Sequence, residues 1–221
     1  MTVFDILIKY HPAFLGGLWV TLQLSFIIWL SGLVIGGALG LAGAKEPGFI
    51  GWPSRVVSFI LSGIPLLVFL FWLHYPAQAI FEVVINPFYT AAFTLSVANI
   101  FLVADMVRGA LLDFPKEYLT AAKVTGLTRK QTVFRIQLPL ILRQILPGLL
   151  MLQVSMLHMT IFASLISVEE IFRVAQRINA QIYRPVEIYT ALGLFFLAVS
   201  LPINGFAFWL KKRFTRNMSE N

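Results

Sequence analysis

The sequence predicts an all-α membrane protein that crosses the bilayer five times, and three observations lead to this fold class. Only 12% of the 221 residues are charged, about half of the roughly 25% that is usual for a soluble domain. Hydrophobic residues make up 58% of the chain, which is more than a soluble fold can hide. The charged residues also form clusters, and five windows without Lys, Arg, Asp or Glu separate them: 10–44, 56–81, 83–104, 144–168 and 188–210.

Each charge-free window is long enough for one helix to cross a bilayer. A crossing needs about 20 residues, and only helices or closed barrels satisfy the backbone in lipid. Barrel strands alternate polar and apolar residues, and these windows do not. Disorder is excluded because it requires low hydrophobicity. We therefore predict one domain over residues 1–221, with spans at about 14–44, 56–80, 86–112, 141–166 and 187–210.

The first span has two features of its own. We expect residues 10–12 to form an interfacial lead-in to it. The apolar stretch that follows is far longer than the 7–15-residue core of a signal peptide, so we expect the first span to be retained. Gly32, Gly36 and Gly40 lie four residues apart on one helix face, and small residues at this spacing let another helix approach closely. The partner of this face is either another helix of the same chain or a second subunit.

The distribution of basic residues predicts the orientation. The loop 45–55, the segment 108–143 and the tail after residue 210 must share one side of the membrane, and they carry thirteen Lys and Arg against four on the other side. The positive-inside rule then places the C-terminus in the cytoplasm and the N-terminus outside. The rule also accounts for the net charge of +7, so no nucleic-acid partner is expected. Cysteine is absent, which excludes a disulfide framework and a thiolate metal site.

The segment from Pro115 to Pro139 is too patterned for a simple cytoplasmic loop. A short apolar helix face is interrupted by Gly126, a residue that readily takes a positive φ at a helix end. Thr128 and Gln131 then fit a capping box for a second helix. We expect two short helices that meet at Gly126, the second ending at Pro139, as a knob on the cytoplasmic face. Such a knob is either a membrane-surface element or a docking element for a soluble partner.

This segment resembles the cytoplasmic loop of ATP-binding-cassette importer permeases. That loop reads Glu-Ala-Ala, three residues, Gly and, after a gap, Leu-Pro, and here Thr120 stands in place of the Glu. The chain reads Thr120-Ala121-Ala122, then Gly126, then Leu138-Pro139. Four further stretches resemble the polar amino-acid uptake branch, which includes the histidine and glutamine permeases, and they follow the family order over nearly the whole chain: 14–22, 63–68, 104–109 and 160–170.

The resemblance implies a type I importer fold and a permease subunit that moves amino acids across the bacterial inner membrane by ATP-driven alternating access. The chain has no GxxxxGK[ST] phosphate loop, so we expect ATP and Mg²⁺ on separate ATPase subunits and neither a cofactor nor an enzymatic activity here. The other implied partners are a periplasmic or lipid-anchored substrate-binding protein and a second permease chain. We favour a heterodimer, because a sibling that retains the loop Glu would compensate for Thr120. The resemblance assigns ATPase coupling to Thr120, Ala121, Ala122, Gly126, Leu127, Phe134, Leu138 and Pro139.

Polar side chains inside the predicted spans are the candidates for a solute path, because their burial costs free energy unless they find partners. The alternative for each of them is a hydrogen bond between helices of the same chain. His158 lies where the family often has Lys. The candidates, with the three strongest first, are Asn99, Gln153, His158, Ser155, Thr160 and Ser164.

Two groups of charged residues are expected to form ion pairs. Asp105 and Arg108 are three residues apart, and we expect them to pair and to hold the third span near the knob. The outer segment 169–187 is expected to carry ion pairs along one helix face, either as a solvated surface or as a docking surface for the binding protein. The residues at helical spacing there are Glu169, Glu170, Arg173 and Arg177.

Amino-acid import has one alternative class of cargo and two competing functions. An opine, a betaine-like solute or a small peptide is the alternative cargo, because residues in the spans depart from the family. A haem-bearing membrane anchor would need paired histidines within spans, and only His74 and His158 qualify, on different spans. An intramembrane enzyme is weaker still, because no HExxH motif is present and Asp105 is the only membrane-proximal acid.

Overall fold

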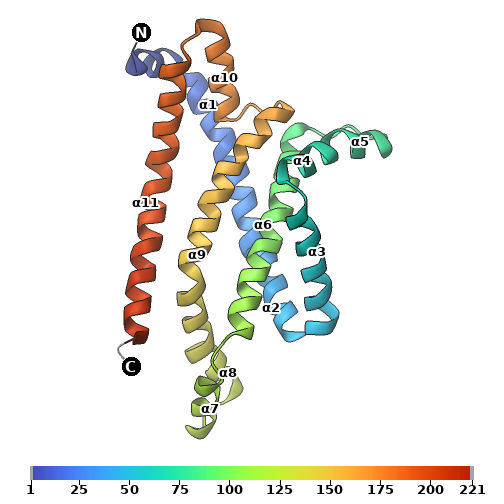
Figure 1. Cartoon of the computed structure of the whole chain (residues 1–221), viewed down its shortest axis with the longest axis vertical. Coiled ribbons are helices and arrows are strands. Elements are labelled where there is room, and N and C mark those ends of the chain that lie inside the picture. Colours follow the sequence, from blue (N-terminus) through green and yellow to red (C-terminus); the bar gives the residue numbers. More distant parts are fainter. Residues whose placement is uncertain (1, 220–221) are drawn as a thin grey trace.

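The protein is a bundle of long helices. The computed structural model describes residues 2–219, with side chains described for residues 2–214, and every regular element in this part of the chain is a helix. The predicted all-α class is therefore confirmed. Figure 1 shows the long helices running along a common direction, with α1 (Val3–Ser31) starting at one end of the bundle and α11 (Pro185–Ser219) finishing at the other.

Four helical stretches within the described residues are long and apolar enough to cross a membrane. They are Val3–Lys45, Pro87–Leu112, Arg129–Ile166 and Pro185–Phe214. The first stretch joins α1, a π-helical turn (Gly32–Gly36) and α2 (Gly37–Lys45), and the second is α6 (Pro87–Leu112). The third joins α8 (Arg129–Thr132), a π-helical turn (Val133–Gln137), α9 (Leu138–Met159) and a 3₁₀ helix (Thr160–Ile166).

The first helix begins ahead of the predicted span 14–44 and includes the residues expected as a lead-in. Thr2 and Asp5 form a capping box that begins α1 at Val3. Residues 10–12 lie inside this helix as a kink, at which Tyr10 has the non-helical angles φ −107° and ψ 15°. Pro12 gives the physical reason, since its ring cannot fit against the carbonyl of the preceding turn in a straight helix.

The second predicted span, 56–80, is not one straight helix. It consists of α3 (Trp52–Gly63, after a π-helical turn at Pro47–Gly51), α4 (Leu66–His74) and α5 (Pro76–Ile80). The two halves, Pro47–Gly63 and Leu66–Ile80, meet at 94°. Pro65 causes the break, because a residue before proline is driven out of the helical region, and Ile64 is extended at φ −105°, ψ 123°. Figure 1 shows α4 and α5 leaving the bundle sideways.

The glycine face of the first helix packs against α6 within the same chain. A Cβ on Gly32 would clash with the Asn99 Nδ2 atom, and one on Gly36 would lie 2.5 Å from the Ile100 carbonyl oxygen. At Gly40 the nearest atom, the Ala104 carbonyl oxygen, would be 2.6 Å away. The spacing therefore serves packing inside the chain, where two helix backbones approach closely.

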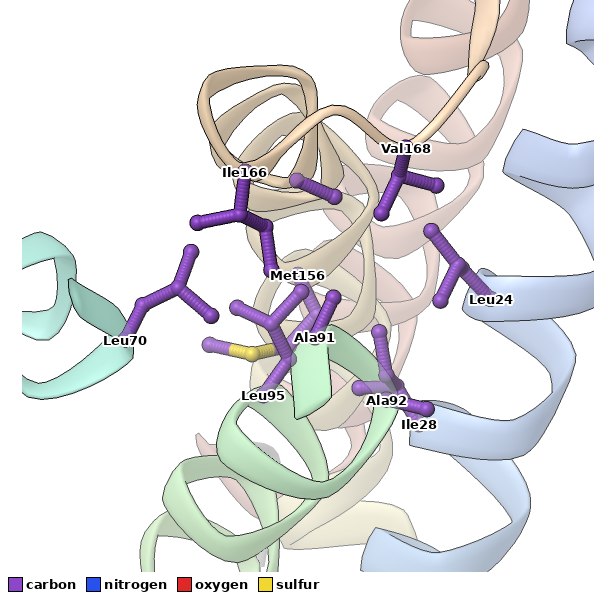
Figure 2. Close-up of a cluster of buried hydrophobic side chains, with 10 residues drawn as sticks. Leu24, Ile28, Leu70, Ala91, Ala92, Leu95, Met156, Ile166 and Val168 are labelled. Atoms are coloured by element: carbon purple, nitrogen blue, oxygen red, sulfur yellow. The ribbon is translucent and has the colours of Figure 1, made fainter. Parts of the chain in front are cut away.

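The largest apolar core lies in the half of the bundle that also holds α4. Leu24 and Ile28 of α1 meet Leu95 of α6, Met156 of α9 and Leu70 of α4, as Figure 2 shows. This cluster fixes the bent pair against the long helices. A second cluster joins α1 to α10 (Ile171–Ile182) and α11, and a third joins α6 to α9 near α7 (Lys116–Val124).

Candidate functional site

The predicted knob is present at the end of the bundle where α6 stops and α9 starts. Figure 1 shows α7 and α8 extending beyond the ends of these two long helices. Phe114, which is buried, packs with Leu119 and Ile136 against Ile141 and Ile145 of α9. The knob is thus anchored by an apolar contact to both helices rather than tethered by the chain alone.

Gly126 closes the first helix of the knob in the left-handed conformation, at φ +75°. The Leu127 N–H donates to the Ala122 carbonyl at 3.0 Å and the Gly126 N–H to the Lys123 carbonyl at 3.1 Å, which is the Schellman pattern of a helix C-terminus. Ala122 is 1% exposed and Leu127 is half-buried, as the apolar contact of that motif requires. The predicted helix break at Gly126 is confirmed.

The second helix of the knob begins as predicted but continues further. Thr128 Oγ1 accepts from the Gln131 N–H at 3.3 Å, and Gln131 Oε1 accepts from the Thr128 N–H at 2.9 Å, so the capping box is confirmed. The expected stop at Pro139 was wrong, because the helix runs on through α9 to Met159. A π-helical turn at Val133–Gln137 comes just before this proline and absorbs the missing N–H and the bulk of its ring. The knob is therefore continuous with a membrane helix.

The outer surface of the knob contains several of the residues that the resemblance assigned to coupling. Thr120 and Ala121 are exposed and line a shallow hollow of about 550 Å³ together with Glu117 and Val124. Val124 is 83% exposed and Phe134 is 59% exposed, which is a high exposure for apolar side chains. Leu138 and Pro139 lie further along the continuous helix. The structure thus separates the residues that hold the knob (Ala122, Leu127) from those that a partner can touch.

Two of the three strongest path candidates hydrogen-bond to each other. The Asn99 Nδ2 atom donates to Gln153 Oε1 at 3.0 Å and to the Ile28 carbonyl at 2.8 Å, and both side chains are buried. The Trp29 Nε1–H donates to the Gln153 carbonyl at 2.9 Å, a contact that the sequence did not reveal. Asn99 and Gln153 therefore join α1, α6 and α9 in the middle of the bundle, and both amides have partners within the chain.

His158 has a different environment from these amides. Its side chain is exposed, its Nε2 atom lies 2.9 Å from Ser200 Oγ, and its ring meets the Phe196 ring edge-on at 5.7 Å between centroids. Ser155 is also exposed, three residues away on the same helix. His158 and Ser155 are thus two exposed polar groups on α9, and His158 contacts α11. Ser200 could not be singled out from the sequence, because one serine in an apolar span carries no pattern.

The remaining two path candidates are buried. Thr160 Oγ1 donates to the Leu157 carbonyl at 2.7 Å. Ser164 Oγ is buried and has no hydrogen-bond partner among the described residues, and the same holds for Ser96 Oγ on α6. Two unpaired hydroxyl groups in a membrane bundle are uncommon, since a buried polar group is normally satisfied.

The predicted pair of Asp105 and Arg108 is present and belongs to a larger network. The Arg108 Nη2 atom donates to Asp105 Oδ1, and Ser58 donates to the other carboxylate oxygen. Arg108 Nη1 also donates to Ser54 Oγ at 3.3 Å. The two serines lie four residues apart on α3, so one face of that helix supplies both partners. The network ties α3 to α6 and neutralises both charges.

The outer segment differs from its prediction at Glu170. Arg177 and Glu169 form an ion pair at 2.9 Å, but Glu170 is fully buried and caps α10 instead. Its carboxylate accepts from the Arg173 N–H at 2.7 Å and from the Phe172 N–H at 2.9 Å. Burial nevertheless raises the pKa of Glu170 to about 7, against the lowering effect of these hydrogen bonds.

The same helix is tightly packed on α1. A Cβ on Gly17 would lie 2.8 Å from Val174 Cγ2, and the Ile171 N–H donates to Thr21 Oγ1 at 3.1 Å. Among the described residues, no group of three His, Asp or Glu side chains is arranged to hold a metal ion. The molecule is therefore a helical membrane protein with a rigid knob at one end and a packed amphipathic helix at the other.

Comparison with known proteins agrees with this class. The chain belongs to the family of binding-protein-dependent transport system inner membrane components, whose model matches residues 20–216. It is 32% identical over 175 residues to the L-cystine transport system permease protein TcyB of Bacillus subtilis, covering 78% of this chain and 74% of the relative. It is 30% identical to the octopine transport system permease protein OccM of Rhizobium radiobacter, covering 85% and 80%.

A solved structure extends the match to the fold. A crystal structure of an amino acid ABC transporter with histidines superimposes with a TM-score of 0.82 at 25% identity, covering 95% of this chain and 98% of that one. The type I importer fold and the resemblance to importer permeases of the amino-acid branch are thus confirmed. The family also establishes that the chain is a membrane component of a transport system.

Proposed function

We propose that this chain is the permease subunit of a bacterial importer that moves an amino acid through the inner membrane and takes its driving force from separate ATPase subunits. The observation that carries the proposal is the knob. Its two helices are fixed by the Schellman turn at Gly126, are anchored to α6 and α9, and expose Val124 and Phe134. Because the second helix continues into α9, a displacement of the knob must move a membrane helix.

We further propose five crossings, with the N-terminus outside and the C-terminus in the cytoplasm. The bent pair, Pro47–Gly63 and Leu66–Ile80, counts as one broken crossing in this topology. An odd number agrees with the first and last helices, which begin and finish at opposite ends of the bundle (Figure 1). The basic residues concentrate at the knob end, as the positive-inside rule requires of the cytoplasmic side.

The proposed partners follow from the two ends of the molecule. ATPase subunits would contact the exposed face of α7, and a substrate-binding protein would contact the outer end near α10. A second permease chain would complete the path, and a heterodimer is favoured. Thr120 supports this choice, since it is exposed on the face where the family carries Glu. If the second permease chain carries that Glu, one of the two knobs in the heterodimer keeps the negative charge that is usual in the family.

The proposed cargo is a polar amino acid, with an opine as the second candidate because the octopine permease is among the relatives. Asp105 is the one carboxylate in the interior of the predicted spans, and Arg108 and Ser58 already occupy it. Inside the described part of these spans, no unpaired carboxylate is therefore left for a substrate ammonium group, while His158 is exposed and can accept or donate a hydrogen bond.

The test is reconstitution of the chain with its ATPase subunits and sibling in vesicles, with uptake measured when ATP and the binding protein are added. Radiolabelled amino acids and opines compete in the same assay, and the solute that binds the cognate binding protein identifies the cargo. Val124→Gln removes an exposed apolar contact of α7 and should lower ATP-driven uptake. Val84→Gln is the matched control, because Val84 is fully exposed next to α5. Equal uptake by both variants and the parent would contradict the docking role of the knob.

A further inference from the structure

A long apolar groove runs along the knob-proximal half of the bundle. Its walls come from three elements: α2 with the turn before it, α6, and the helix that leads from the knob into α9. The groove holds about 250 Å³, and on the α9 side it extends from Val133 to Leu149, a length of about 24 Å for a helix. Leu33, Leu41 and Leu142 in its walls remain 45–52% exposed, so none of the described side chains covers them fully.

The chemistry of the walls is almost uniform. Apart from Gly37 and Gln137, every residue that lines the groove is aliphatic, and most of them lie within predicted spans. The volume is below the roughly 300–1,000 Å³ of pockets for compact small molecules. A narrow, elongated apolar channel of this kind fits a hydrocarbon chain better than a polar solute.

The end of the groove next to the knob is basic on both sides. Lys45 lies one turn beyond Leu41 on one wall, and Arg129 lies one turn before Val133 on the other, with Lys130 beside it. All three side chains are exposed, and none of them forms an ion pair within residues 2–214. The acidic neighbours are Glu46 on the α2 wall and Asp113 at the end of α6, so the three cations still leave the mouth with an excess of positive charge.

We propose that the groove binds one anionic phospholipid, with an acyl chain along α2, α6 and α9 and the phosphate at the basic mouth. The argument is the complementarity of both ends: an aliphatic channel in the membrane region and unpaired cations where its headgroup would lie. Clusters of Lys and Arg at this depth favour anionic headgroups. The lipid would contact α2 and α8 together and so connect the knob to the first membrane helix.

The test uses the purified transporter complex in detergent, with native mass spectrometry to count retained lipids. The probes are phosphatidylglycerol and phosphatidylcholine with identical acyl chains. We expect the complex to retain phosphatidylglycerol in preference. Replacing the two cations together (Arg129→Gln with Lys130→Gln) should weaken its retention about 25-fold, since each basic residue contributes a factor of roughly five. Lys212→Gln, an exposed cation on α11 outside the groove, should leave retention unchanged.

A second variant tests the channel rather than the charges. Leu142→Trp fills the groove and should reduce retention of both lipids, whereas Leu194→Trp, at an exposed position on α11, should not. Equal retention of the two lipids by the parent, or unchanged retention in both groove variants, would overturn the proposal. A change of subunit stoichiometry in Leu142→Trp would also overturn it, because a second protein chain would then be the occupant.

Discussion

A substitution series at Gly126 tests how far transport depends on the left-handed turn of the knob. A Cβ at this position meets no atom within 4 Å, so the only cost of a side chain is the backbone conformation at φ +75°. That cost is about 1–2 kcal/mol for an ordinary residue and up to about 3 kcal/mol for a strained one. Asn tolerates this region better than other residues, which orders the expected losses as Asn, Ala and then Val.

The magnitude of the loss follows from the population of the correct turn. Each 1.4 kcal/mol shifts an equilibrium about tenfold, so Gly126→Val is expected to lower the equilibrium constant for the native turn by up to about 100-fold. Uptake in reconstituted vesicles and ATP hydrolysis stimulated by the binding protein are measured in parallel. We expect ATP-driven uptake to fall in the order of the series, while the amount of protein in the membrane stays constant.

The control is Gly193→Val on α11. Its Cβ also meets no atom within 4 Å, but its backbone is helical and needs no positive φ. If Gly126→Val transported as fast as Gly193→Val, or if Asn were as damaging as Val, the turn would not be the element that transmits force.

Three further predictions concern other parts of the molecule. Asn99→Leu leaves the buried amide of Gln153 without its partner and should lower the free energy of unfolding by about 1–3 kcal/mol. Unfolding in denaturing detergent measures this free energy. The double variant Asn99→Leu with Gln153→Leu should recover part of the loss, whereas a further decrease would argue against the pair. The raised pKa of Glu170 stabilises the fold below pH 4.5, and this stability is lost as the pH rises through about 7, at up to about 1.4 kcal/mol per pH unit. Thermal unfolding at pH 5 and pH 7.5 should therefore show a smaller decrease with pH in Glu170→Gln than in the parent, and equal slopes would contradict the assignment. His158→Ala should change the KM for uptake more than the maximal rate, and unaltered uptake kinetics would exclude His158 from the solute path.

The sequence predicted the helical class and much of the knob because those features depend on local chemistry. Gly126 and the Thr128–Gln131 box act within a few residues, so their pattern in the chain is sufficient. The end at Pro139 was mispredicted because a proline usually ends a helix, and the π-helical turn that accommodates it has no clear sequence signature. The break at Pro65 was missed for a related reason, since hydropathy measures the apolar length of a window and not its direction.

The path candidates show the limit of reasoning from single residues. Polar residues in apolar spans could be identified, but not their partners, because Asn99 and Gln153 are 54 positions apart. Glu170 shows the same limit. Its charge suggested a solvated helix face, but the side chain is buried where α10 packs against its neighbours.

The amino-acid sequence by itself determined that the chain lies in a membrane, that it is helical and that a rigid knob lies at its basic end. These properties are sums over composition and short-range pattern, and lipid leaves the backbone few alternatives. Only the tertiary structure decided which polar groups are already paired, that the glycine face serves packing within the chain and that an apolar groove with a basic mouth stays open. Those properties depend on which helices meet and at what register. Close packing between residues that are far apart in the chain determines both.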